Sequence, residues 1–121
     1  MGITISLDTG ALAYVYIDDV VRAFLSAGIL PRTTGRVFNV GSGVATAVRD
    51  AFALIVDQAN RATGATSRLC DVPWPEEPDP IESRNFVADV RRMEDTYGWK
   101  PMVSLPDGVH RLIDSLSVTP P

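Results

Sequence analysis

The hydrophobic spacing changes from strand-like to helical within one stretch of the sequence, Tyr14-Val-Tyr-Ile-Asp-Asp-Val-Val-Arg-Ala-Phe-Leu25. Residues 13–17 are mainly aromatic or β-branched, a composition that predicts a short strand. From Asp18 the spacing becomes helical and continues until Gly28, with apolar positions at Val20, Val21, Phe24, Leu25 and Ala27. The stretch therefore predicts a strand that leads directly into a helix.

The segments on either side extend this pattern. Upstream, residues 3–7 predict a second strand, with Asp8-Thr9-Gly10 as the turn between the two strands. Downstream, residues 31–35 predict a loop. The apolar run 36–40 then predicts another strand, which is followed by Gly41-Ser-Gly43.

The rest of the chain continues the alternation of helices and short strands. The predicted elements are a helix from Thr46 (its N-cap) to Ala59, a weak strand at 66–70, a proline-rich loop at 73–80, a short strand at 86–88, a helix capped by Asp89 and ended by Gly98, a helix from Ser104, and a frayed tail at 118–121. We expect one domain over residues 1–121, of mixed α/β class with about four helices and several short strands.

The composition excludes several classes of function. A net charge of −4 gives no basic surface for a nucleic acid. One Cys and one His, Cys70 and His110, are too few for a structural zinc site or an intrachain disulfide, so we expect no metal and a reducing compartment. The N-terminus resembles no signal peptide, and charges interrupt the most apolar region, residues 11–30. We therefore expect a cytoplasmic protein with no membrane partner.

The glycine pair at positions 41 and 43 has two interpretations. A strand, Gly-x-Gly and a helix in this order are the context of a dinucleotide site. The third glycine of that motif would stand at position 46, which is Thr46, and no acidic residue ends a following strand. We therefore expect a tight turn between a strand and a helix.

The other candidate groups also have a structural and a functional interpretation. Asp18 and Asp19 are adjacent on a helix and do not face a common ligand, so we expect helix capping rather than a metal or acid-base pair. The acids of the proline-rich region could bind a cation, but a solvated loop is expected for Glu76, Glu77, Asp79 and Glu82. His110 is expected at the surface, Cys70 in the core, and Trp99 in packing.

The order of these segments resembles a known family. The segments are Tyr14 to Leu25, Gly35-Arg-Val-Phe-Asn-Val-Gly-Ser-Gly43, Pro73-Trp-Pro75, Phe86-Val-Ala-Asp-Val90, Tyr97-Gly-Trp-Lys-Pro101 and Ser104-Leu-Pro-Asp-Gly-Val109. Together they resemble the C-terminal, substrate-binding part of the NAD-dependent epimerase/dehydratase family, the extended short-chain dehydrogenases that act on nucleotide sugars. The resemblance covers about residues 3 to 117.

The resemblance also indicates what this chain lacks. The family's dinucleotide-binding half, with its glycine-rich loop, is not in the sequence. The family's catalytic Tyr-x-x-x-Lys is absent, because the only lysine, Lys100, stands three residues after Tyr97. Without such a lysine nothing lowers the pKa of a tyrosine for proton transfer. We therefore expect no catalytic residue, no bound NAD or other cofactor, and no epimerase or dehydratase activity from this chain as it stands.

Two positions are candidates for substrate binding by resemblance. The family's arginine two residues before the aromatic at position 14 would meet a diphosphate, and here that position is Leu12. Tyr14 remains and either faces a base or sugar or packs in the core. The family's glycine-aspartate pair before Phe86 is replaced by Arg84-Asn85, and Arg84 is either a replacement cation or an exposed loop residue.

Three functions remain open at this point. The chain is a shortened, non-catalytic relative of the substrate lobe that binds a sugar nucleotide weakly; or it is a homo-oligomeric interaction module without a ligand; or it is a fragment that needs a separate chain with the NAD-binding half. Residues 37–40 would normally join the sheet of that half, so we expect an uncovered strand edge and self-association, as a dimer.

Overall fold

A computed structural model describes residues 2–6, 10–30, 35–74, 76–77 and 79–117. The elements in chain order are β1 (Gly2–Ser6), β2 (Ala11–Leu12), α1 (Ile17–Ile29), β3 (Thr46–Ala47), α2 (Val48–Thr63), β4 (Arg68–Val72), the 3-10 helix η1 (Pro80–Ser83), α3 (Arg91–Tyr97) and α4 (Leu105–Ser117). Within the described residues, the predicted mixed α/β class is confirmed. The predicted turn at Asp8 and Thr9, the loop at 31–34 and the tail at 118–121 lie outside the described residues.

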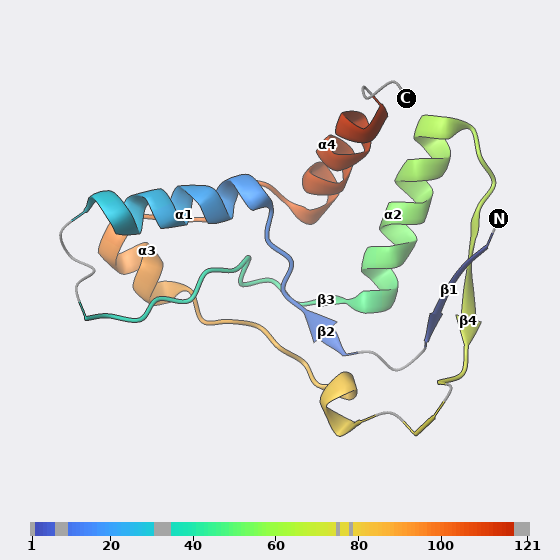
Figure 1. Cartoon of the computed structure of the whole chain (residues 1–121), viewed down its shortest axis with the longest axis horizontal. Coiled ribbons are helices and arrows are strands. Elements are labelled where there is room, and N and C mark those ends of the chain that lie inside the picture. Colours follow the sequence, from blue (N-terminus) through green and yellow to red (C-terminus); the bar gives the residue numbers. More distant parts are fainter. Residues whose placement is uncertain (1, 7–9, 31–34, 75, 78, 118–121) are drawn as a thin grey trace.

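The strands β1 and β4 form a parallel pair in which Gly2 lies opposite Arg68 and Ser6 opposite Val72. A parallel pair needs a long crossover connection, and α2 belongs to that connection and lies beside the pair (Figure 1). Both strands were predicted, and each is displaced by only one or two residues. They occupy the end of the molecule opposite to α1 and α3 (Figure 1).

The short strands β2 and β3 pair antiparallel, with Leu12 opposite Thr46. Next to β2, the Ala13 N–H donates to the Phe86 carbonyl at 3.2 Å, and the Phe86 N–H donates to the Ala11 carbonyl at 2.9 Å. The strand predicted at 13–17 is wrong. The Tyr16 carbonyl accepts the N–H groups of Asp19 and Val20 at 3.1 and 3.2 Å, so the helix begins at Ile17.

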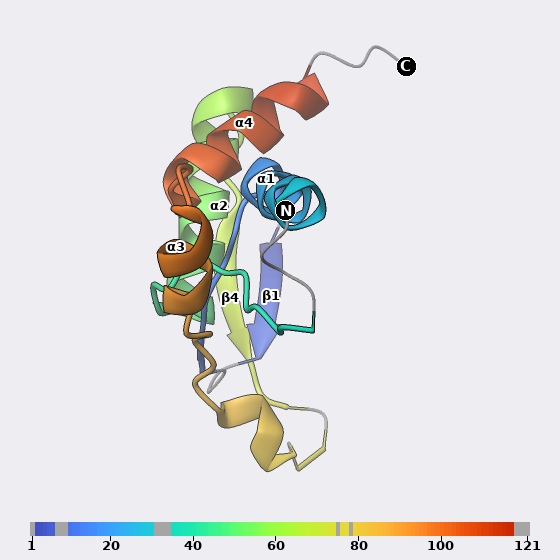
Figure 2. The ribbon, with the colours of Figure 1, turned by 90° about the vertical axis from the view of Figure 1, so that its left-hand side faces the viewer.

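The helix α1 buries small residues and exposes large ones. Ala23 is 1% exposed, whereas Phe24 is 71% exposed. The exposed large side chains follow helical spacing, so they share one side of the helix; we call Ile17, Val21, Phe24, Leu25 and Ile29 the apolar face of α1. Figure 2 views α1 nearly end-on, with no other helix covering its outer side. This face is not part of the described core.

The core cluster joins α1, α3 and the residues after α3. Ala23, Met93 and Trp99 are fully buried, and the partly buried Phe38, Val40, Val90 and Tyr97 pack against them. The strand predicted at 36–40 is wrong, because side chains rather than a neighbouring strand bond to this region. Arg92 Nη1 donates to the Val37 carbonyl at 2.9 Å, and Asn39 Nδ2 donates to the Asp89 carbonyl at 3.3 Å.

The ends of three helices test the predicted caps. Gly98 ends α3 in the left-handed conformation, with φ at 65°, and Ser104 Oγ accepts the Asp107 N–H at 3.2 Å before α4; both predictions are confirmed. Asp89 is not the N-cap of α3, because Val90 holds that position; Asp89 Oδ1 accepts the N–H of Arg91, the first residue of α3, at 3.0 Å. Thr46 is not the cap of α2: it belongs to β3, and Ala47 precedes the helix without a side-chain hydrogen bond.

The accessible surface of the chain is large for its mass. It measures 8689 Å², about a third more than the ~6,400 Å² expected of a compact protein of 13.1 kDa. No helix among the described residues is long and apolar enough to cross a membrane.

Candidate functional site

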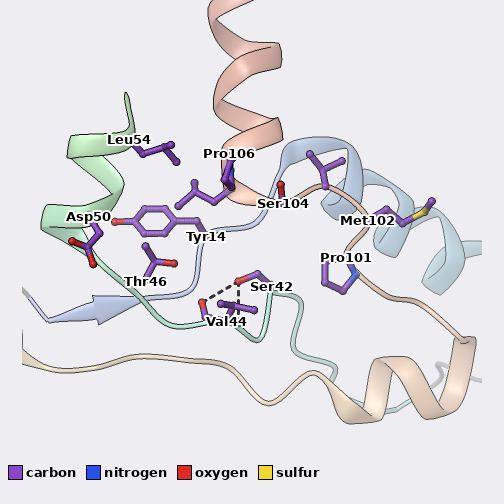
Figure 3. A pocket seen from close by; sticks show the side chains of 12 residues that line it. Tyr14, Ser42, Val44, Thr46, Asp50, Leu54, Pro101, Met102, Ser104 and Pro106 are labelled. Atoms are coloured by element: carbon purple, nitrogen blue, oxygen red, sulfur yellow. Dashed lines mark hydrogen bonds between the residues drawn. The ribbon is translucent and has the colours of Figure 1, made fainter. Parts of the chain in front are cut away.

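Tyr14 lies in the extended segment between β2 and α1 and lines a hollow of about 570 Å³, which we call the Tyr14 hollow. Figure 3 shows its ring between α2 and the start of α4, with the hydroxyl directed toward Asp50. The remaining lining residues come from the turn before β3, from β3, from α2, and from the segment before α4 with the first two residues of that helix: Ser42, Val44, Thr46, Leu54 and residues 101–106.

The lining of the Tyr14 hollow is mostly apolar, with a smaller set of aromatic, hydroxyl and acidic side chains. It combines the Tyr14 ring and hydroxyl with the hydroxyls of Ser42, Thr46 and Ser104 and the carboxylate of Asp50. The lining residues include no Lys, Arg or His. An aromatic face stacks on rings, and hydroxyls and a carboxylate bind the hydroxyl and N–H groups of an uncharged ligand. A phosphate group in this hollow would meet a carboxylate without a compensating cation.

One wall of the hollow, residues 101–104, is attached to α1 through Asp19. The carboxylate oxygen Oδ2 accepts the N–H groups of Met102 and Val103, each at 2.9 Å, and Oδ1 accepts Arg22 Nη2 at 2.6 Å. The Asp19 carbonyl also accepts Trp99 Nε1 at 3.0 Å. The predicted capping role is wrong for Asp19, whose partners lie 80 to 84 residues away in sequence apart from Arg22.

The ionisation of Asp19 follows from these contacts. Burial by itself would raise the pKa of this carboxyl, but the hydrogen bonds from Val103, Arg22 and Met102 lower it further than burial raises it. The net pKa lies below the ordinary value of an aspartate. Asp19 is therefore a buried carboxylate that remains charged at neutral pH.

The Gly41-Ser-Gly43 segment forms a turn at the edge of the hollow. Ser42 Oγ accepts the Val44 N–H at 3.3 Å, and Gly43 adopts a positive φ of 69°. The helix α2 begins only at Val48, after β3, so the glycine pair does not open directly into a helix. The geometry agrees with the tight turn that we expected and differs from a dinucleotide loop.

Arg84 lines a second hollow, of about 400 Å³, which we call the Arg84 hollow. Its guanidinium lies 5.5 Å from the centre of the Phe86 ring. The neighbouring Asn85 accepts the Ala11 N–H with Oδ1 at 2.8 Å and so fixes the segment against β2. The other lining residues are Gly10, Leu12, Val48, Ile81 and Glu82.

The two hollows adjoin across the β2–β3 pair. They share no lining residue, so Tyr14 and Arg84 do not meet in one cavity. Leu12 of the Arg84 hollow lies directly opposite Thr46 of the Tyr14 hollow in the strand register. Directly opposed residues in an antiparallel pair project to the same face, about 5 Å apart. Leu12, where the resemblance expects an arginine, thus lines the same hollow as Arg84.

The remaining candidate groups do not line these two hollows. Lys100 Nζ pairs with Glu94 at 2.7 Å, and this hydrogen bond raises the pKa of the lysine. His110 lies 3.4 Å from Asp114 on the exposed side of α4, as expected. Cys70 is exposed on β4, so its predicted core position is wrong. Trp99 is buried as predicted. No three His, Cys, Asp or Glu side chains of the described residues gather as metal ligands.

Sequence reasoning missed most of the lining of the Tyr14 hollow. Asp50 was not singled out, because a single acid near the start of a helix is ordinary. Thr46 was noted only as a cap, and residues 101–106 only as the approach to a helix. The one available signal was Asp19, an acid on the side of α1 that carries Ala23 rather than on its apolar face.

No protein-family model matches the chain. Several curated proteins align with most of it. UDP-glucose 4-epimerase of Mycolicibacterium smegmatis is 36% identical over 101 residues, which are 84% of this chain and 29% of that protein. The dTDP-4-dehydro-6-deoxyglucose reductase of Escherichia coli is 27% identical over 103 residues, 85% of this chain and 30% of that protein. The chain thus spans less than a third of the length of these relatives.

A solved structure agrees with these alignments. UDP-glucose 4-epimerase of Thermotoga maritima, solved with UDP-glucose, superposes with a TM-score of 0.77 at 29% identity. The match covers 96% of this chain and 35% of that protein. The fold of the described residues is therefore the fold of one part of these longer proteins.

Proposed function

We propose that this chain, which is related to one part of the NAD-dependent epimerase/dehydratase family, is a non-catalytic lobe that binds a sugar nucleotide. The observation that supports this function is the adjacency of the two hollows. The Tyr14 hollow offers an aromatic face, hydroxyls and a carboxylate to an uncharged ring, and the Arg84 hollow offers a cation. A sugar nucleotide carries uncharged rings joined to a diphosphate, so its two chemistries match the two hollows.

The charge distribution supports one placement of the parts of the ligand. Arg84 is the only cation in the two linings, and although the Glu82 carboxylate lines the same hollow, we expect the diphosphate beside the guanidinium. Leu12 lies in the same hollow, where a second cation would strengthen phosphate binding. One exposed arginine holds a diphosphate weakly, and we expect a dissociation constant near the millimolar range, which corresponds to about −4 kcal/mol.

The test is a titration of the chain with UDP-glucose followed by amide chemical shifts and calorimetry. Arg84→Gln removes the cation and is expected to weaken binding by about tenfold or more, because a hydrogen bond to a charged group contributes about 1.5–3 kcal/mol. Tyr14→Ala removes the stacking face and is expected to weaken binding by about fivefold, because an aromatic contact contributes of order 1 kcal/mol. Leu12→Arg is expected to tighten binding by a similar factor.

Arg68→Gln is the matched control for the lost charge, because Arg68 is exposed on β4 outside both hollows. This variant should bind UDP-glucose as the unmodified chain does. Absence of heat and of shift changes at millimolar UDP-glucose in the unmodified chain would remove the sugar-nucleotide function. If Arg68→Gln and Arg84→Gln weaken UDP-glucose binding equally, the effect of Arg84 is a non-specific charge effect.

A second candidate function is an interaction module, and the apolar face of α1 favours it. Phe24 is 71% and Ile29 76% exposed, and large apolar side chains gathered on one exposed face are typical of an interaction surface. A second copy of the chain, or a chain that carries an NAD-binding half, would cover this face. If the partner is the chain that carries an NAD-binding half, the lobe would become part of an NAD-dependent epimerase or dehydratase.

The association is tested by light scattering and sedimentation over a range of concentrations. The unmodified chain is expected to form dimers, and Phe24→Asp to be monomeric, because a charge at a central aromatic position of an interface costs several-fold to hundred-fold in affinity. Ala62→Asp, which adds the same charge at an exposed position of α2, is the control and should not change the mass. If the unmodified protein is monomeric at high concentration, self-association is contradicted. The partner to seek is then a separate polypeptide that carries an NAD-binding half.

A further inference from the structure

The segment that forms one wall of the Tyr14 hollow is held from a distance by one side chain. The N–H groups of Met102 and Val103 both donate to Asp19 Oδ2 at 2.9 Å. Arg22, which pairs with Asp19 Oδ1, extends the contact, because its Nη2 also donates to the Lys100 carbonyl at 2.6 Å. Three residues within a run of four, Lys100, Met102 and Val103, are thus bonded to adjacent turns of α1.

These bonds differ from ordinary helix capping and from a surface ion pair. Asp18, one residue earlier, is exposed, and no side-chain hydrogen bond caps α1. Asp19 is 1% exposed, and its carboxylate accepts N–H groups from residues outside its helix. A buried carboxylate is costly unless its oxygens are hydrogen-bonded, and here two backbone amides and one guanidinium supply the bonds.

We propose that Asp19 is a positioning residue for ligand binding, which fixes the main chain at Met102 and Val103 so that the following side chains form the wall opposite Tyr14. The proposal rests on the proposed binding function. Asp19 does not line the hollow and so acts only through residues 102 and 103. Because both N–H groups are directed at Asp19, they are unavailable to a ligand, and the wall presents side chains instead.

The experiment combines amide hydrogen exchange with the UDP-glucose titration. In the unmodified chain, the Met102 and Val103 amides should be protected. Asp19→Asn keeps one acceptor and Asp19→Ala keeps none, so protection of these two amides should fall in that order, by about tenfold or more, while amides in the middle of α2 keep their protection. UDP-glucose affinity should fall in the same order. Asp18→Asn, which removes the same charge one residue away, is the control and should change neither quantity.

The outcomes separate the two proposals. Unprotected Met102 and Val103 amides in the unmodified chain would overturn the role of Asp19, and this measurement needs no variant to fold. Lost protection at these amides with unchanged UDP-glucose affinity would also overturn it, as would an equal loss of protection throughout α2, which indicates a general loss of stability. Protected amides with no UDP-glucose binding in the unmodified chain would overturn the proposed function and, with it, the role of Asp19 in binding.

Discussion

Replacing Trp99 with alanine is expected to remove about 3–5 kcal/mol from the free energy of unfolding. Trp99 is 2% exposed and packs with Ala23 and Met93 in the core cluster. Its indole N–H donates to the Asp19 carbonyl, and the Arg22 guanidinium lies 5.8 Å from its ring centre. The substitution therefore leaves a cavity and also removes a contact between α1 and the segment after α3.

The loss is measured by urea unfolding followed by circular dichroism. A loss of this size is a large part of the 5–15 kcal/mol that stabilise ordinary domains, so Trp99→Ala should be partly unfolded without denaturant. Leu116→Ala is the control, because Leu116 is 70% exposed on α4 and its truncation should change stability by no more than about 0.5 kcal/mol. Equal losses in the two variants would contradict the core cluster.

The second large effect is expected at Gly10. A Cβ added there would overlap the carbonyl oxygen of Arg84, which is backbone and cannot turn aside. Gly10→Ala should therefore destabilise the chain by about 3 kcal/mol, the upper end of the usual cost of overpacking. It should also separate β2 from Phe86, so the Ala13 and Phe86 amides should lose protection from hydrogen exchange.

Gly28 offers a control with the opposite sign. It lies near the end of α1, and an added Cβ would meet no atom within 4 Å. Gly28→Ala should raise the free energy of unfolding by about 0.4–1 kcal/mol, because alanine restricts the unfolded chain and favours the helix. If both alanine variants lost stability equally, the close approach of Gly10 to Arg84 would be refuted.

The features that could be predicted from the sequence are those that neighbouring residues in the chain determine. The helix that ends at Gly98 and the helix that begins after Ser104 follow from residues within one turn of each end. The mixed α/β class followed from the alternation of strand-like and helical hydrophobic spacing along the chain. The resemblance to the epimerase/dehydratase family, carried by motifs in order, is likewise confirmed by the relatives.

What could not be predicted depends on contacts between distant residues. Residues 36–40 have strand composition, but the Arg92 guanidinium donates to the Val37 carbonyl, and the Asn39 side chain holds the segment by donating to the Asp89 carbonyl. Asp19 appears to local reasoning as a cap, and its partners Met102 and Val103 follow 83 and 84 residues later. The period of α1 predicts a helix and an apolar side, but only the tertiary structure determines that Ala23, and not Phe24, faces the core.

The parallel pairing of β1 with β4 also sets an order of events during synthesis. Gly2 pairs with Arg68, so β1 leaves the ribosome long before its partner is made. At about 5–20 residues per second, the delay is roughly 3–13 s. During that interval the hydrogen-bonding groups of β1 can pair with any other extended chain within reach. Only the synthesis of β4 gives the backbone of β1 the partner that it has in the folded chain.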